Sequence, residues 1–323
     1  IELHGELGLR AFTDPASENG FGGNRGPWSD LHVRYDKGVG DSTSLFTSLT
    51  NTTNLWPAVA DLHPVASVGL HWGRFRHING DIAIRGGRWF SWPWPGQVTR
   101  YEPWFDGEPL EAGQTAFFRA YSFARLDLTL IADSTDRAVL PRRGARVVLT
   151  GTPAGLARGH LFMRGEADVR GFVPLGSQRW VWGIRGLGGW MDFHHPQDKA
   201  LLGERFFLGA IDMRAWGRHR VVPTNYAGDA YDLRPGGNLS TYGNTDLAWH
   251  LHRDLALTVF VDVGRVWDDL DQIDIDDLLV DTGASVSLLV LGSSLRLDVA
   301  FRPTLQPIDT TPYGIQLWLD LPY

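Results

Sequence analysis

The chain has 323 residues, a formal net charge of −7 and no cysteine. This acidic balance, without any block of basic residues, argues against a nucleic-acid partner. No stretch approaches the roughly 18 uncharged apolar residues that a spanning helix needs. A helical membrane protein is therefore excluded, in line with a mean hydropathy of −0.17. The chain begins at Ile1 without a methionine or an apolar signal segment, so we interpret it as a processed or excised chain.

Apolar and polar residues alternate in short segments from the first residues to the last, which is typical of β-strands with one apolar face. About 13 such strands can be identified. In chain order they cover residues 3–11, 31–35, 65–73, 78–86, 124–132, 145–151, 160–171, 179–190, 241–251, 255–264, 281–291, 295–302 and 312–323. We therefore expect an all-β fold in which residues 1–323 form a single domain.

The polar faces of these strands carry charges. The strand at 295–302 alternates apolar side chains with Arg296, Asp298 and Arg302, and the strand at 3–11 sets Glu6 and Arg10 opposite its leucines. Charges that recur on one face do not fit a packed sandwich core, whereas a hydrated lumen accepts them. The pattern predicts an antiparallel transmembrane β-barrel whose apolar face meets lipid.

Short connections, such as residues 38–41, 252–254 and 292–294, alternate with longer ones, such as 13–27 and 268–279. One short rim and one long rim is the layout of outer-membrane barrels, which have an even number of strands in bacterial single chains. We therefore expect at least one more strand, in the region from Trp89 onward. The crowded aromatic residues there fit either an aromatic girdle or a structured external loop: Trp89, Trp92, Trp94, Tyr101 and Trp104.

Three motifs occur in the second half of the chain. A long segment between Leu201 and Asn238 contains Met213-Arg214-Ala215-Trp216 and ends in Gly236-Gly237-Asn238, and the strand after next contains Phe260-Val261-Asp262-Val263-Gly264. These residues resemble the superfamily of outer-membrane insertases and two-partner-secretion transporters that includes BamA, TamA and FhaC. The resemblance covers roughly Ala124 to Tyr323 and implies a barrel of 16 strands.

In that superfamily a V-R-G-F/Y motif on the sixth external loop folds back into the lumen, and its arginine pairs with the aspartate of an F-x-D-x-G strand. The resemblance therefore implies a lumen-folded loop at about residues 192–237, in which Arg214 pairs with Asp262. The alternation of residues 257–264 independently turns Asp262 toward the lumen. A guanidinium and a carboxylate held away from bulk water form a charge-assisted pair, which we expect to act as a structural lock. Ala215 departs from the usual glycine.

The resemblance extends to two turns. Asp133-Ser134-Thr135-Asp136, followed by Pro141 and Gly144, resembles the family's D-x-R-D…P-x-x-G turn, with Thr135 in place of arginine. Phe172-Val173-Pro174-Leu175-Gly176 resembles its short turn after a strand. Family members also carry periplasmic POTRA modules before the barrel, and no such module is included in residues 1–323.

The first and last strands are expected to form the closing seam, with residues 3–11 pairing with residues 315–323. An aromatic residue at the end of the chain is the assembly signal of such barrels, and Tyr323 occupies that place. Gln316 and Asp320 lie on the polar face of the last strand. The seam and signal residues are Leu7, Leu9, Leu317, Leu319, Leu321 and Tyr323.

One enzyme motif competes with this interpretation. Val280-Asp281-Thr282-Gly283-Ala284 matches the hydrophobic-D-T-G-A/S string of aspartic peptidases, in which two facing aspartates activate water. A single-chain enzyme needs a second D-T/S-G, and Asp41-Ser42-Thr43 and Asp133-Ser134-Thr135 both lack the glycine. Asp281 also begins a predicted strand, so the peptidase is a remote alternative and no catalytic residue is assigned.

We predict no metal site and no cofactor. His194 and His195, with Asp192 and His219, lack the spacing that converges on one ion. The acidic stretch from Asp268 to Asp277 lacks the glycine turn and the final glutamate of an EF-hand, and we interpret it as a solvated external loop.

The sequence thus predicts a barrel in the bacterial outer membrane that inserts or transports proteins and carries out no bond-making chemistry. Its expected partners are outer-membrane lipid, lipopolysaccharide, and client proteins or partner subunits. The alternative is a barrel without its own translocase activity that acts as an anchor or pore subunit of a larger complex, because fold alone does not decide function.

Overall fold

The computed structural model describes residues 2–8, 12–13, 28–40, 43–55, 59–75, 77–93, 121–137, 139–157, 159–193, 204–209, 212–216, 221–223, 236–290, 293–306 and 312–320. The strands are β1 (Glu2–Gly8), β2 (Phe12–Thr13), β3 (Trp28–Gly40), β4 (Thr43–Leu55), β5 (Val59–Phe75), β6 (Ile78–Pro93), β7 (Tyr121–Asp133), β8 (Gly144–Ala157), β9 (His160–Leu175), β10 (Ser177–Phe193), β11 (Leu239–His252), β12 (Leu255–Trp267), β13 (Leu279–Val290), β14 (Ser293–Phe301) and β15 (Tyr313–Asp320). A short 3-10 helix, η4 (Leu270–Gln272), follows β12. Within these residues no helix has the length and apolar character needed to cross a membrane.

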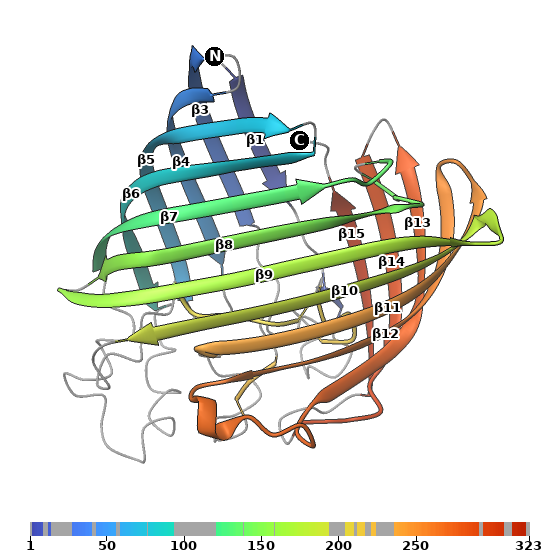
Figure 1. The fold of residues 1–323 in the computed structure, drawn as a ribbon. Coiled ribbons are helices and arrows are strands. Elements are labelled where there is room, and N and C mark those ends of the chain that lie inside the picture. The colour runs from blue at the N-terminus through green and yellow to red at the C-terminus, as the bar shows by residue number, and fades with distance from the viewer. Residues whose placement is uncertain are drawn as a thin grey trace, which may run out of the picture.

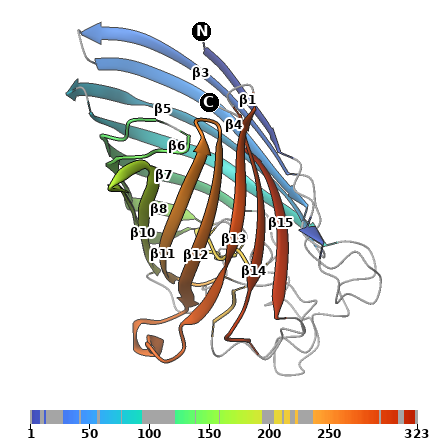
Figure 2. The same ribbon diagram turned by 90° about the vertical axis from the view of Figure 1, so that its right-hand side faces the viewer.

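All the strands belong to one antiparallel sheet that curves around a central space (Figures 1 and 2). From β3 to β15 each strand pairs with the next one in the chain. The fold is thus the antiparallel transmembrane barrel that the sequence predicts, built as an up-and-down meander. Chain neighbours pair because their connections are short on one rim, where β9 and β10 are separated by Gly176 alone.

The ends of the sheet approach one another at the rim of the long connections. β15 pairs with β2 through Ile315 opposite Thr13 and Gln316 opposite Phe12. β1, only four residues upstream of β2, pairs with β3 on its other side. Four chain steps span at most about 15 Å, so the two sheet edges are close at this rim.

The described residues correct one expectation about this seam. The partner of Ile315 is Thr13, and among the described strands β1 makes no ladder with β15. Leu7 lies in β1 opposite Ser29, and Leu317 and Leu319 lie in β15 opposite Leu297 and Leu295. The remaining residues of the expected seam and assembly signal, Leu9, Leu321 and Tyr323, lie outside the described part of the chain.

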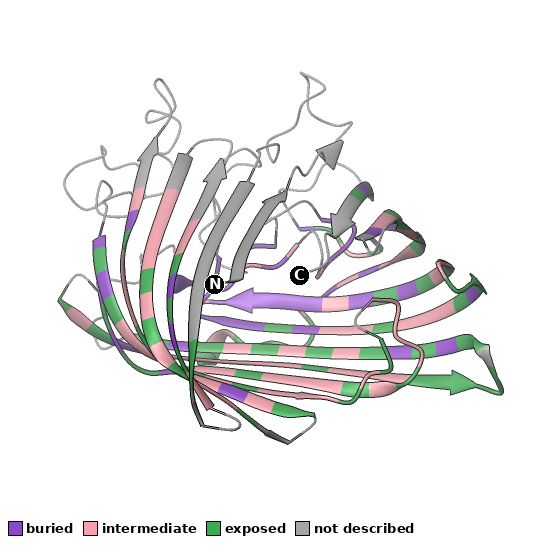
Figure 3. Ribbon diagram, turned by 90° about the horizontal axis from the view of Figure 1, so that it is seen from above, coloured by how far each residue is buried: buried purple, intermediate pink, exposed green. Residues whose placement is uncertain are grey.

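Burial is inverted relative to a water-soluble protein, since the exposed side chains of the strands are mainly apolar and the buried ones are often polar. On β12, Val259 and Val261 point outward, whereas Asp262 between Val261 and Val263 is fully buried. On β13, Val286 is exposed between the buried serines Ser285 and Ser287. Buried and exposed positions alternate in this way along the strands (Figure 3). An apolar exterior and a polar lumen are what a membrane-spanning sheet requires.

The additional strand expected from the even count is found at a different place. β4 covers Thr43–Leu55, whereas Trp89 belongs to β6 and residues 94–120 lie outside the described part of the chain. The short-period pattern of β4 is interrupted because Phe46 points inward and is buried, while Thr47 points outward among exposed leucines. The total of 16 strands stays a prediction, since the described residues form 15 strands including the two-residue β2.

Candidate functional site: the lumen-folded loop

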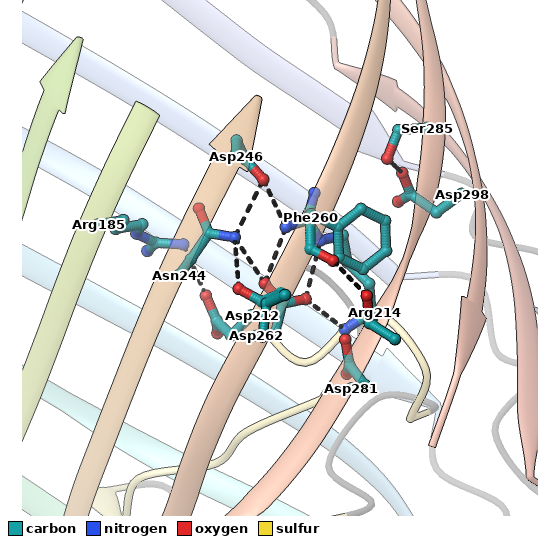
Figure 4. A network of polar contacts seen from close by, with 12 residues as sticks. Arg185, Asp212, Arg214, Asn244, Asp246, Phe260, Asp262, Asp281, Ser285 and Asp298 are labelled. Carbon is teal, nitrogen blue, oxygen red and sulfur yellow. Dashed lines mark hydrogen bonds and ion pairs between the residues drawn. The ribbon is translucent and has the colours of Figure 1, made fainter. Parts of the chain in front are cut away.

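The described residues of the loop between β10 and β11 lie against the lumen side of the wall, and Arg214 is one of them. Arg214 donates from Nε to Asp262 Oδ2 and from Nη2 to Asp262 Oδ1, both at 2.8 Å. The pair is therefore bidentate, and Asp262 on β12 is fully buried (Figure 4). Planar guanidinium and carboxylate groups match in this geometry, which fixes orientation as well as distance.

Further groups on the wall surround the pair. The side chains of Tyr242 and Asn244, both on β11, donate to Asp262 Oδ1 at 3.1 and 2.7 Å. Arg214 Nη2 also donates to Asp246 Oδ1 at 2.8 Å, and its guanidinium carbon lies 3.4 Å from the centre of the Phe260 ring. Because the carboxylate is taken out of water, these donors replace its lost hydration.

The backbone of the motif is held as well as its side chain. Ala215 N donates to Asp281 Oδ2 on β13 at 3.0 Å. Gln316 on β15 donates from Nε2 to the carbonyl oxygens of Arg214 at 2.6 Å and Trp216 at 2.8 Å. β15 therefore holds the loop through main-chain atoms, which any residue type at those two loop positions would supply.

Asp281 lies directly opposite Asp262 in the β12–β13 ladder, and both side chains are fully buried. This is the facing of two aspartates that the peptidase alternative needs. However, Asp262 is engaged by the Arg214 guanidinium and Asp281 by the Ala215 amide, and neither carboxylate is accessible to water. The arrangement favours loop attachment over hydrolysis.

A second ion pair of opposite polarity lies two residues before Arg214. Asp212 in the loop accepts from Arg185 Nη1 on β10 at 2.9 Å. The same guanidinium bridges to Asp168 on β9, with Nε and Nη2 at 3.0 and 2.9 Å from the carboxylate oxygens. Asp212 and Arg214 thus fasten one short segment to two separate strands, and a uniform shift of the loop would break both pairs.

The first described part of the loop is attached farther around the wall. Glu204 accepts from Arg125 Nη1 on β7 at 2.6 Å, and the Arg164 guanidinium on β9 lies 4.4 Å from the centre of the Phe206 ring. Arg205 pairs with Asp268 just after β12 and donates to the Gly236 carbonyl at 3.1 Å. The loop therefore contacts the wall from β7 to β15.

Apolar packing also holds the motif from Met213 to Trp216 against the wall. Met213 and Trp216 are fully buried in a cluster that includes Phe260 on β12. Small residues of the wall allow this approach. A Cβ at Gly264 would lie 3.2 Å from the Met213 sulfur, and one at Gly314 would overlap the Ala215 carbonyl oxygen.

The tripeptide Gly236-Gly237-Asn238 ends the loop directly before β11. Phe206 and Gly237 exchange two backbone hydrogen bonds of 2.9 Å. Gly236 has φ +65°, and a Cβ there would overlap the Phe206 carbonyl oxygen, so this position requires glycine. Asn238 Nδ2 donates to the Asp268 carbonyl at 3.1 Å. By contrast, Ala215 does not have a positive φ, and alanine replaces the family glycine there without backbone strain.

Burial shifts the pKa values of the loop carboxyl groups. Desolvation raises the pKa of Asp212 and of Glu204, and it outweighs the nearby guanidinium groups of Arg185 and Arg125. Desolvation lowers the pKa of Arg205 to about 10. For Arg214 desolvation also opposes the charge, but the hydrogen bonds and charge of Asp262 outweigh it and raise the pKa. Arg214 is therefore held in its charged form by Asp262.

The sequence placed Arg214, Asp262 and their neighbouring motif residues, and the structure brings these residues together. It did not single out Asp212, Glu204, Asp281 or Gln316 as attachments of the loop. The sequence signal for their partners was the series of charges on the lumen faces of the strands, at Arg125, Asp168 and Arg185. Among the described residues no group of acidic, histidine or cysteine side chains has the geometry of a metal site, and His194, His195 and His219 lie outside them.

Fold and site together define a membrane β-barrel of outer-membrane type with a loop fastened inside its lumen. Residues 119–317 match the Omp85 superfamily domain. This is more than half of the chain, which therefore belongs to the Omp85 superfamily. No curated protein sequence matches the chain.

Two solved structures are similar in fold. BamA from Haemophilus ducreyi lacking POTRA domains 1–3 matches with a TM-score of 0.69 and 13% identity over 91% of this chain and 62% of that chain. CdiB from Acinetobacter baumannii matches with a TM-score of 0.57 and 11% identity over 91% of this chain and 50% of that chain. This chain thus spans less than two thirds of either protein, and at these identities the likeness concerns the fold.

Proposed function

We propose that this chain is the membrane barrel of a protein that inserts or translocates other proteins at the bacterial outer membrane. Membership in the Omp85 superfamily and the fold shared with BamA and CdiB support this proposal. The observation that carries it is the buried attachment of Arg214 to Asp262, which holds a loop inside the lumen by polar contacts. A loop held by directional pairs has defined attached and released states, which a protein-handling barrel needs when a client arrives.

The chemistry of each face of the barrel indicates which partner it would contact. Its outward apolar side chains suit the hydrocarbon of the outer membrane, and its long-connection rim would face the lipopolysaccharide leaflet. Client proteins or partner subunits of an outer-membrane complex would meet the lumen and the edge between β1 and β15, where the described pairing is limited to two residues of β2.

The proposal is tested by reconstituting the protein in liposomes and presenting an unfolded outer-membrane barrel protein as the client. Folding of the client is followed by its shift in mobility on gels without boiling. We expect Arg214→Ala to reduce the initial rate by about tenfold while the barrel itself remains folded, since about 1.4 kcal/mol in the activation free energy, a part of what loss of a buried charge partner costs, gives that factor. Arg179→Ala, at an exposed position near the start of β10, is the matched control. A wild-type barrel that never accelerates client folding would contradict the proposal.

A second candidate is an anchor or pore subunit without its own activity. The observation that favours it is the extent of the loop contacts, since attachments from β7 to β15 keep loop residues within the lumen. Conductance across a planar bilayer distinguishes a lumen that is blocked by the loop from a lumen that is open. We expect low conductance for the wild-type barrel and a clear increase for Asp212→Ala combined with Arg214→Ala. High wild-type conductance would favour the pore, and low conductance without client folding would favour the anchor.

A further inference from the structure

The turn between β7 and β8, residues 134–143, lies against the turn between β11 and β12. Arg137 Nη1 donates to the Arg253 carbonyl at 3.4 Å, and Arg142 Nη2 donates to the His252 carbonyl at 3.5 Å. Each is a single long hydrogen bond from a group with five N–H donors. In the described part of the chain neither side chain has an ion pair, so most of its donor capacity is unused there.

His250 lies next to these arginines on the inner side of the wall. Its side chain is buried on β11, whereas its neighbours Trp249 and Leu251 are exposed on the lipid face. Arg142 and Arg137 are close enough for their charges to act on His250. His250 Nδ1 and Arg142 Nε are both buried, and neither has a hydrogen-bond partner in the described part of the protein. Two buried polar atoms near this turn are thus without a hydrogen-bond partner among the described residues.

The local acidic group does not neutralise this cluster. Asp136 Oδ1 accepts from the backbone amides of Arg142 at 2.8 Å and Arg143 at 3.2 Å. Although desolvation acts the other way, these hydrogen bonds and the charge of Arg137 lower the pKa of Asp136, which is therefore ionised at neutral pH. One carboxylate faces several guanidinium groups, and Asp254 is already paired with Arg253 at 3.2 Å. The turn retains a positive excess.

We propose that Arg137, Arg142 and His250 form a binding site for the carboxylates of an acidic polypeptide segment at the short-turn mouth of the lumen. Guanidinium groups bind carboxylates through strong charge-assisted hydrogen bonds, and an imidazole ring nitrogen that carries a proton is a further donor. The ligand is a polypeptide because the inward position of His250 separates the site from lipid headgroups outside the barrel. The proposal rests on the protein-handling function above and names the chemistry of the segment that is handled.

The test measures binding of a fluorescent peptide of alternating glutamate and serine to the full chain in phosphatidylcholine nanodiscs. A peptide with glutamine in place of glutamate is the ligand control. We expect Arg137→Gln combined with Arg142→Gln to weaken binding of the acidic peptide by about tenfold or more, since two charge-assisted contacts are lost. Lys37→Gln with Arg179→Gln removes the same charge from exposed positions of the same rim and should change binding by less than about twofold.

A second measurement uses the unmodified protein, so the result does not depend on folding of the variants. Bound acidic peptide should protect Arg137 and Arg142, but not Arg179, from phenylglyoxal, as read by mass spectrometry. Equal weakening in both double variants, or equal binding of the glutamine peptide, would overturn the proposal. Binding that appears only when anionic phosphatidylglycerol is added to the nanodiscs would do so as well, in favour of a lipid site. Because the assay needs no insertion activity, its failure is distinguishable from failure of the proposed function.

Discussion

At the scale of single residues, the Arg214–Asp262 pair has more polar neighbours than an isolated ion pair has. Asp246 and Asp281 also lie against the motif, so reversing the two charges would place a new carboxylate at position 214 beside existing ones. We therefore expect the double reversal Arg214→Asp with Asp262→Arg to restore stability only in part. A cycle of alanine variants isolates the pair more cleanly.

We predict that Arg214→Ala lowers the free energy of unfolding by about 3–5 kcal/mol, because Asp262 is left buried without its charge partner. The cycle with Asp262→Ala should give a coupling energy above about 1.5 kcal/mol, measured by urea unfolding in lipid. The control is the exposed pair Arg253–Asp254, whose coupling should stay below about 1 kcal/mol. Equal coupling energies for both pairs would refute the role of a lock.

Gly314 on β15 provides a second prediction at this scale. Its hydrogen faces the Ala215 carbonyl oxygen, and a Cβ there would overlap that atom. Gly314→Ala should therefore displace the loop motif and cost about 1–3 kcal/mol of stability, as overpacking does elsewhere. Protease sensitivity of the loop measures the displacement. Gly165→Ala on β9, where a Cβ meets nothing within 4 Å, should leave the loop protected.

At the scale of elements, the turn between β7 and β8 is ordered by the carboxylate of Asp136. Its folded pKa is lowered from 3.8, so its contribution is complete above that value and is lost as the pH falls through the lowered one. We predict that hydrogen-exchange protection of the Arg142 and Arg143 amides decreases on acidification below about 3.8. Asp136→Ala should remove this protection at all pH values. Protection that persists in the alanine variant would show that the turn is ordered by other contacts.

The residue pattern of β4 explains why the sequence did not predict this strand although it predicted its neighbours. In strands with alternating charged and apolar residues, such as β14, the sequence directly predicts which side chains share a face. β4 carries threonine, serine and asparagine on both faces, and its buried Phe46 points into the lumen where a polar residue is expected. The pairing of β4 with β3 and β5 supplies the missing information, since hydrogen bonds of the backbone do not depend on side-chain polarity.

At the scale of the whole molecule, the two ends of the sheet meet at the long-connection rim. Because the chain has no cysteine, engineered pairs can be tested without background. We predict that Thr13→Cys with Ile315→Cys forms a disulfide under mild oxidation, because paired residues of an antiparallel ladder have suitable Cα separations. Leu7→Cys with Leu319→Cys, which lie opposite each other when residues 3–11 pair antiparallel with residues 315–323, should remain reduced. The reverse result would restore the seam expected from the sequence.

The alternation of the sequence was enough to predict the class of fold, and its resemblance to a known superfamily implied the central pair of the loop. Period-two alternation reports the two environments of a strand residue by residue, and the motifs around Arg214 and Asp262 identify both partners even though 48 positions separate them. The other attachments, from Glu204 on Arg125 to Gln316 on the loop backbone, became visible only in the folded structure. Such contacts depend on which strand faces which loop residue across the lumen. The local periodicity of the sequence does not predict these contacts, because the acceptors are often main-chain atoms that every residue possesses.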